Sequence, residues 1–207
     1  QKPWRKTWQS ARIGEASRIA YNDWWLELVS SLAVEKDVDG LHPQTLQAIK
    51  DGTWKEQGKV LPATAAAVLT IMEDFAASQQ QPLTAYNTSI IGISDLLGRP
   101  LFFELKSRGV ECELLGRKGL QEKMDSGEGL TKSDIIVSAT GVEGLVTGKM
   151  VGEGSALIDV GEPRPDVDIN SVIKANKASF ITPVPGGVGP LTIVSLLRNV
   201  VTLVQNA

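Results

Sequence analysis

The chain has 207 residues, of which 42% are hydrophobic, and its 21 basic and 24 acidic residues give a formal net charge of −3. These values describe a globular protein of one domain or two small ones. The lysines and arginines are scattered and form no basic stripe that could neutralise a phosphate backbone, so we expect no nucleic-acid partner. One cysteine, Cys112, and one histidine, His42, exclude an intramolecular disulfide and leave few ligands for a metal cluster, so we expect no metal.

The sequence shows no signal for export or membrane insertion. No apolar run reaches the ~20 residues that a membrane-spanning helix needs, and residues 1–5 lack the apolar core of a signal peptide. The single cysteine also suits a reducing compartment. We therefore expect a cytoplasmic protein that contacts no membrane and has small molecules as its ligands.

The pattern of hydrophobic residues changes at residues 79–82, where three glutamines and a proline separate two segments. Before this point, residues 61–75 are rich in alanine and carry apolar residues at helical spacing, which predicts a helix. We place a domain boundary here. It divides the chain into a first domain of residues 1–78, a second domain of residues 79–188 and a C-terminal segment of residues 189–207.

After this boundary, short apolar segments alternate with helical patterns. The expected strands are residues 89–91, 110–115, 134–139 and 156–160, and the expected helices are residues 100–108 and 191–204. Strands separated by helices connect through right-handed crossovers and form a parallel sheet. The sequence therefore predicts an α/β protein with a Rossmann-like domain. The last helix carries Val194, Leu197, Val201 and Val204 on one face, which predicts that this face docks on another apolar surface.

The first expected strand runs into a glycine-containing loop and the start of a helix. This segment contains Gly92, Ile93, Ser94, Gly98 and Arg99. In a parallel sheet such a turn can bind a nucleotide, because glycines admit a pyrophosphate close to the backbone and a helix N-terminus favours negative charge. The spacing differs from the G-x-G-x-x-G fingerprint, so an ordinary strand-to-helix turn is the alternative.

The end of the second expected strand distinguishes between the two nicotinamide cofactors. NAD enzymes place a carboxylate there to accept hydrogen bonds from the ribose, whereas this sequence has Arg117 and Lys118. Two cations at this position could pair with a 2′-phosphate, which favours NADP. A solvated loop explains the same two residues equally well.

Three longer strings go beyond general fold signals. They are residues 36–43 (KDVDGLHP), residues 159–161 (DVG) and residues 183–192 (PVPGGVGPLT), and shorter ones are residues 62–64 (PAT), 92–100 (GISDLLGRP) and 139–141 (ATG). In order and spacing these strings resemble the methylenetetrahydrofolate dehydrogenase/methenyltetrahydrofolate cyclohydrolase family from about Val34 to the C-terminus. The resemblance implies NADP-dependent oxidation of 5,10-methylenetetrahydrofolate, then hydrolysis to 10-formyltetrahydrofolate, in one-carbon metabolism and purine biosynthesis.

The resemblance also implies an arrangement of domains. The first domain would be a smaller α/β folate-binding domain, completed by the C-terminal helix, and the second would be the Rossmann-like NADP domain. Tetrahydrofolate derivatives would be the ligands of a cytoplasmic homodimer.

Functional residues of the family carry over onto matching positions. The aspartate that matches Asp39 holds the pterin in that family, which makes Asp39 the candidate catalytic and substrate-binding carboxylate, with a turn residue as the alternative. The implied folate-site residues are Pro185, Gly186, Gly187, Val188 and Gly189. The implied cofactor-binding residues are Gly92, Ile93, Ser94, Gly98, Arg99, Arg117, Lys118, Thr140, Gly141, Glu162 and Thr192. We interpret His42 as a hydrogen-bonded surface residue and not as a base.

The sequence departs from the family pattern at several positions. Ile93 replaces the family arginine that is credited with binding the 2′-phosphate, and Arg117 replaces a family serine. The positive charge for the 2′-phosphate would therefore come from Arg117 instead of position 93. Trp25 stands four residues after Tyr21, where the family has its catalytic lysine. The family's Q-L-P-L-P string is also missing before Val34, so either the protein lacks this segment or the sequence omits it.

Two further features leave the function open. Trp4, Trp8, Trp24 and Trp25 have no counterpart in the family and could form a core, an interface or an exposed face. Hydride transfer depends on positioning and could survive loss of the lysine, whereas hydrolysis needs a group that transfers protons near neutral pH. A non-catalytic folate- or NADP-binding protein would also lack the lysine. An unrelated oxidoreductase similar to shikimate dehydrogenase is disfavoured by residues 183–190.

Overall fold

The computed structural model describes residues 15–206, with side chains from residue 23 onward. The helices are α2 (Glu15–Ser30), α3 (Pro43–Lys50), α4 (Ala63–Ser78), α5 (Gly98–Ser107), α6 (Arg117–Asp125), α7 (Ile169–Ala175) and α8 (Val188–Gln205), with 3-10 turns η1 (Val34–Lys36) and η2 (Leu83–Ala85). The strands are β1 (Thr88–Ile91), β2 (Cys112–Leu115), β3 (Ile135–Ser138), β4 (Ser155–Asp159) and β5 (Ala178–Ile181).

Within residues 15–206, the five strands form one parallel sheet in the order β2-β1-β3-β4-β5. Ile90 of β1 pairs with Leu114 of β2 on one side and with Val137 of β3 on the other. The chain passes through α5 to β2 and then through α6 back across β1 to β3, so the strand order reverses between β1 and β3. Open parallel sheets bind ligands at the carboxyl ends of the strands beside such a reversal. The expected parallel α/β sheet is confirmed.

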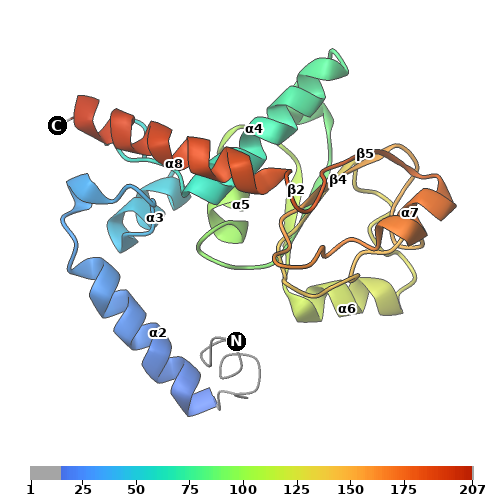
Figure 1. The fold of residues 1–207 in the computed structure, drawn as a ribbon, viewed down its shortest axis with the longest axis horizontal. Coiled ribbons are helices and arrows are strands. Elements are labelled where there is room, and N and C mark those ends of the chain that lie inside the picture. The colour runs from blue at the N-terminus through green and yellow to red at the C-terminus, as the bar shows by residue number, and fades with distance from the viewer. Residues whose placement is uncertain (1–14, 207) are drawn as a thin grey trace.

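Alternate residues of the strands face two separate apolar cores, as the pleat of a strand requires. The core beneath α4 and α5 contains Met72, Ile90, Leu101, Ile135 and Val137. The core on the opposite face, beneath α6 and α7, contains Ile91, Leu120, Ile136, Leu157 and Val172. The sheet therefore lies between two helical layers, and Figure 1 shows α6 and α7 together on the side away from α4 and α8.

Helix α8 packs against α4, and its docking face differs from the one expected. The buried side chains of α8 include Ser195, Asn199 and Leu203, whereas the expected face of Val194, Leu197, Val201 and Val204 is 51–73% exposed. The more polar row is the buried one because Asn199 bonds to backbone carbonyls beneath it. By length and composition alone α8 could span a membrane, but apolar helices of protein cores meet the same criteria, so this is weak evidence.

Helix α2 projects away from the sheet and contacts α3 (Figure 1). Trp24 and Trp25 on this helix are 55% and 43% exposed, so neither is part of the buried core. Trp4, Trp8 and the side chain of Tyr21 lie outside the described residues. For the two described members of the tryptophan group the buried-core interpretation is therefore wrong, and an interface or an exposed face stays a prediction.

Several local features differ from the expectations. Helix α6 begins at Arg117, where the sequence predicted the end of a strand with a solvated loop as the alternative interpretation, because Gly116 ends the extended chain and Leu120 is buried in the first helical turn. Helices α3 and α7 and strand β5 were not expected. His42 is buried and not on the surface; its Nδ1 accepts a hydrogen bond from the backbone N–H of Gln44 at 3.1 Å and so caps α3.

Candidate functional site

A cavity of about 980 Å³ lies at the carboxyl ends of the strands. Its walls come from the loops after β1, β3, β4 and β5, from the start of α4 and from the first turns of α8. The lining residues are Thr64, Ser94, Leu96, Leu97, Ala139, Thr140, Gly141, Asp159, Val160, Gly161, Glu162, Pro163, Pro183, Val184, Pro185, Gly186, Gly187, Val188, Gly189, Pro190, Thr192 and Ile193. The cavity therefore lies where the strand order reverses, and its volume is within the range of ligand sites, about 300–1,000 Å³.

The loop after β1 makes a close approach to the loop after β3. Gly92 has φ +118, and a Cβ built on it would lie 2.5 Å from the carbonyl oxygen of Ala139. Only glycine fits this position, because any side chain would collide with the neighbouring backbone. Beyond this contact the first loop contributes Ser94 to the cavity wall and leads to α5 at Gly98.

The loop after β4 is organised by a buried carboxylate. Asp159 accepts hydrogen bonds from the backbone N–H groups of Gly161 (2.8 Å), Asp166 (3.1 Å) and Val167 (2.8 Å). Burial raises the pKa of Asp159, and these backbone N–H groups oppose the rise by stabilising the charged form. Asp159 therefore shapes the loop that carries Glu162, a predicted cofactor residue that is exposed at the cavity.

The loop between β5 and α8 brings all five predicted folate-site residues, Pro185 to Gly189, to the cavity. Thr182 begins this loop, and its Oγ1 accepts the backbone N–H of Asp159 at 2.8 Å, which joins the ends of β4 and β5. Thr192, in the first turns of α8, lines the same space. The predicted folate residues and part of the predicted cofactor set thus share one cavity.

Arg117 and Lys118 lie at the start of α6, next to the loop after β1 and outside the cavity lining. A Cβ built on Gly116 would be 3.5 Å from Cγ2 of Ile93, so Ile93 packs against the residue before Arg117. Both cations are exposed, and Lys118 is 3.6 Å from Glu122 in a surface ion pair. The isoleucine that replaces the family arginine is therefore close to the arginine that replaces the family serine.

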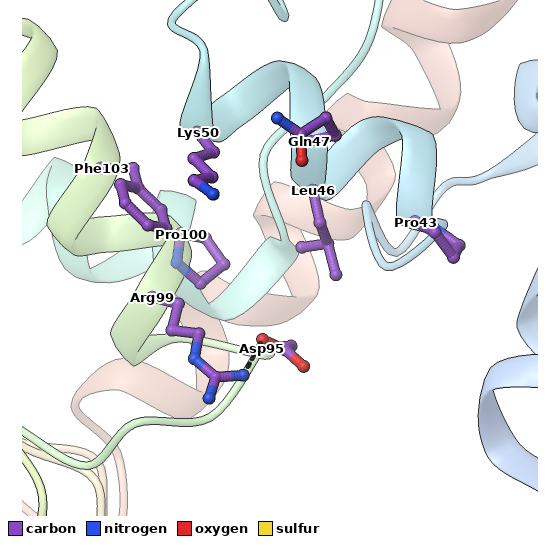
Figure 2. A pocket seen from close by; sticks show the side chains of 8 residues that line it. All are labelled: Pro43, Leu46, Gln47, Lys50, Asp95, Arg99, Pro100 and Phe103. Carbon is purple, nitrogen blue, oxygen red and sulfur yellow. Dashed lines mark hydrogen bonds and ion pairs between the residues drawn. The ribbon is translucent and has the colours of Figure 1, made fainter. Parts of the chain in front are cut away.

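Arg99 lies away from the large cavity, although it follows the same loop. It lines a smaller pocket of about 270 Å³ between α3 and α5, together with Leu46, Lys50 and Phe103. Figure 2 shows its guanidinium directed at Asp95, and the two side chains form an ion pair of 2.9 Å. In this arrangement Arg99 is already paired with Asp95 and lies outside the large cavity.

The two aspartates in the turn of residues 37–40 differ in burial and in hydrogen bonding. Asp37 is buried and accepts the backbone N–H groups of Leu41 and His42, each at 3.0 Å. Asp39 is exposed and, among the described residues, makes no hydrogen bond or ion pair; it is also absent from the cavity lining. Gly40 has φ +69, and a Cβ there would lie 2.7 Å from the backbone nitrogen of Pro62. Asp37 thus shapes the turn and leaves Asp39 free to meet a ligand.

Comparison with known families identifies the chain. Residues 62–207 match the family described as tetrahydrofolate dehydrogenase/cyclohydrolase, NAD(P)-binding domain. The chain belongs to this family. The resemblance expected from the sequence is thereby confirmed, and the cavity lies in the part of the chain that matches the family's NAD(P)-binding domain.

Relatives in the tetrahydrofolate dehydrogenase/cyclohydrolase family match most of the chain. "Bifunctional protein FolD 2" from Lactobacillus johnsonii is 38% identical over 187 residues, covering 86% of this chain and 60% of that protein. "Bifunctional protein FolD" from Methanosarcina barkeri is 35% identical, with 84% of this chain and 58% of that protein covered. The chain therefore spans about 60% of the length of these curated relatives.

Solved structures of the family have the same fold as this chain. The bifunctional FolD enzyme from Campylobacter jejuni superposes with a TM-score of 0.74 at 32% identity, covering 87% of this chain and 62% of that one. The FolD protein from Trypanosoma brucei, solved with NADP cofactor and an inhibitor, gives a TM-score of 0.71 at 29% identity, with 87% and 62% covered.

Sequence reasoning about this family member missed Asp166 and most of the apolar cavity lining. Asp166 is fully buried and bonds to Ser138 and Thr140. Its place in the string PDVD, shortly after residues 159–161, was the available signal. Leu96 and Leu97 were inside a recognised loop but carry no chemistry that marks them. Within the described part of the chain, no three His, Cys, Asp or Glu side chains gather in a way that could hold a metal ion.

Proposed function

We propose that this protein binds NADP in the large cavity and oxidises 5,10-methylenetetrahydrofolate to 5,10-methenyltetrahydrofolate. The observation that carries this proposal is that the loops matching the family's cofactor and folate motifs line one continuous space of about 980 Å³. A redox reaction between two bound molecules requires that they meet at their reacting atoms. NADP would supply the hydride acceptor, and the chain's own residues would bind and orient both molecules.

The cofactor side of the cavity fits a nucleotide. The close approach at Gly92 leaves backbone without side chains beside the reversal of strand order, and α5 begins directly after this loop at Gly98. A helix N-terminus and an exposed backbone favour a pyrophosphate. We place the nucleotide against Gly92, Ser94, Thr140 and Gly141, with Glu162 and Thr192 on the facing loops.

The preference for NADP over NAD would come from the start of α6. The neighbouring strand β2 ends without a carboxylate that would repel a 2′-phosphate, and Arg117 follows Gly116 there. Ile93 stands where the family has an arginine, and it packs against Gly116, the residue before Arg117. Arg117 could therefore supply the positive charge that Ile93 lacks. Arg117 is exposed and makes no ion pair among the described residues, so its charge is free for a phosphate.

The folate side of the cavity would be the loop of residues 183–189. Its glycines allow a flat ring to lie against the backbone. Asp39 would complete this site from the first domain by accepting hydrogen bonds from the pterin. Asn199 fixes the turn that carries Asp39 by donating to the carbonyl oxygen of Val38 at 2.9 Å. We also propose that the protein is a homodimer and is located in the cytoplasm, as the family resemblance implies.

The hydrolytic step requires a side chain that can transfer protons near neutral pH. The position expected for the family lysine holds Trp25, which is exposed on α2, and an indole cannot transfer protons near neutral pH. We therefore propose that the 207-residue chain acts mainly as a dehydrogenase. General acid–base help is worth ~10²- to 10⁴-fold in rate, so hydrolysis of the methenyl product should be slower by that order.

The assay that tests this proposal uses the 207-residue protein with 5,10-methylenetetrahydrofolate and either NADP or NAD. We expect NADP-dependent formation of methenyltetrahydrofolate, which accumulates because its hydrolysis is slow. Binding of NADP and folate without turnover would favour the alternative, a non-catalytic folate- and NADP-binding relative. Failure to bind NADP would contradict the proposed dehydrogenase. Size-exclusion chromatography with light scattering tests the homodimer.

A further inference from the structure

Asp166 is a fully buried carboxylate that lies behind the cavity wall and touches the chain on two sides. Its Oδ2 accepts hydrogen bonds from the backbone N–H of Thr140 at 2.6 Å, from Oγ1 of Thr140 at 2.8 Å and from Oγ of Ser138 at 2.8 Å. Ser138 is the last residue of β3, and Thr140 belongs to the loop that follows it. One oxygen atom thus fixes the direction in which the chain leaves β3.

The backbone of Asp166 is itself fixed by the neighbouring strand. Asp159, at the end of β4, accepts the N–H of Asp166 at 3.1 Å and that of Val167 at 2.8 Å. Two carboxylates therefore act in series, from β4 through the backbone of Asp166 to the loop after β3. Thr140 and Asp159, at the two ends of this series, both line the cavity.

The second carboxylate oxygen of Asp166 shows that this arrangement has a cost. Oδ1 is buried and has no hydrogen-bond partner, and a Cβ built on Gly161 would lie only 2.7 Å from it. A buried acceptor without a partner is destabilising. An apolar residue would remove this unpaired atom but would leave the three donors of Ser138 and Thr140 without an acceptor. Asp166 therefore satisfies three donors through Oδ2, while its Oδ1 stays without a partner.

We propose that Asp166 is a positioning residue that holds the loop of Thr140 and Gly141 in the shape that accepts NADP. This inference rests on the proposed function. The N–H and the hydroxyl of Thr140 both donate to Asp166, and the same hydroxyl accepts the N–H of Val142 at 3.2 Å. Thr140 consequently offers a ligand its carbonyl group and its methyl surface, while the shape of the loop depends on Asp166.

The test compares two substitutions at this position by calorimetric titration with NADP and by amide hydrogen exchange at Thr140. Asp166→Asn keeps the size of the side chain and can turn its remaining oxygen towards the three donors, so it should fold. Replacing a charged acceptor with a neutral one should weaken NADP binding about tenfold. Asp166→Ala should weaken it further, and in both variants the Thr140 amide should exchange faster.

Asp168→Ala is the matched control, because Asp168 is also an aspartate of this segment but caps α7 by accepting the N–H of Ser171 at 3.0 Å. It should lower stability without changing NADP affinity. If the wild-type protein binds NADP and Asp166→Asn binds equally well with unchanged exchange at Thr140, the inference is overturned. The same follows if Asp168→Ala weakens binding as much. Absence of NADP binding by the wild-type protein would instead overturn the proposed function, and the inference with it. Should Asp166→Ala fail to fold, Asp166→Asn decides alone.

Discussion

The side-chain amide of Asn199 donates a hydrogen bond to the carbonyl oxygen of Val38 at 2.9 Å, across 161 positions in the sequence. The same nitrogen donates to the carbonyl oxygen of Leu61, also at 2.9 Å, and the side chain is buried. One residue of α8 thus joins the turn that carries Asp39 to the chain just before α4. The C-terminal helix is therefore attached to the chain before α4 through a specific polar contact.

Removal of this contact should destabilise the protein. Asn199→Ala removes the side-chain donor from the buried carbonyl group of Leu61 and from the partly buried one of Val38, which should lower the free energy of unfolding by about 1–3 kcal/mol. Urea denaturation followed by circular dichroism measures this change. The control is Asn206→Ala, because Asn206 donates to the carbonyl oxygen of Gly58 at 3.2 Å on the exposed surface. Its loss should be within about 0.5 kcal/mol, and equal losses for the two variants would contradict the prediction.

Arg117 should determine the choice between NADP and NAD. Arg117→Ala should weaken NADP binding roughly tenfold, because a charge-assisted contact with the 2′-phosphate is lost, and should leave NAD binding nearly unchanged. Fluorescence or calorimetric titration with each cofactor measures the difference. Lys132→Ala, which removes a surface cation paired with Glu128 at 3.3 Å, is the control for a general effect of charge. A parallel loss for NADP and NAD would show that Arg117 is only a solvated surface residue.

Asp39 should bind the pterin of the folate substrate. Asp39→Asn keeps the size of the side chain but presents a donor to the pterin's N–H groups, which should cost about 2–4 kcal/mol of folate binding free energy if the pair is buried. Calorimetry with tetrahydrofolate measures this loss. Glu35→Gln, an exposed carboxylate on η1, is the matched control and should not change affinity. An unchanged affinity for Asp39→Asn would remove Asp39 from the site.

Cys112 should be protected from thiol reagents in the folded protein. Burial raises the pKa of this thiol to about 11, and the reactive form is the thiolate. Relative to an ordinary thiol of pKa about 8.5, the thiolate fraction at pH 8 falls roughly two to three hundredfold. Ellman's reagent should therefore react slowly with native protein and rapidly in urea. Fast labelling of the native protein would contradict the burial of Cys112.

The raised pKa also has a consequence for stability. The native state retains the proton of Cys112 at pH values where the unfolded chain has begun to lose it. The contribution of this thiol to stability is therefore fully present below about pH 8.5 and is lost as the pH rises towards 11. Cys112→Ser should flatten this alkaline part of the stability profile, which urea titrations from pH 8 to pH 10 would show.

Much of the sheet could be predicted from the sequence, because its signal is local. The apolar segments that became β1, β3 and β4 are continuous and are buried along their whole length. Strand β5 was missed because its four residues are only partly buried or exposed, and α7 was missed because one buried residue, Val172, gives it no apolar periodicity. A pattern of hydrophobicity can reveal only those elements that bury a complete face or stripe.

In the candidate site, too, some features could be predicted from local sequence and others could not. The sequence by itself determined the family and the loops that line the cavity, because glycine and proline strings such as residues 183–189 record backbone requirements at fixed spacing. Tertiary structure decided the directions and partners of the side chains. It placed Arg99 in a pocket beside α3, Asp166 behind Thr140, and Asn199 against the turn that carries Asp39. Contacts between residues 26 to 161 positions apart depend on how strands and helices pack, and no local pattern encodes them.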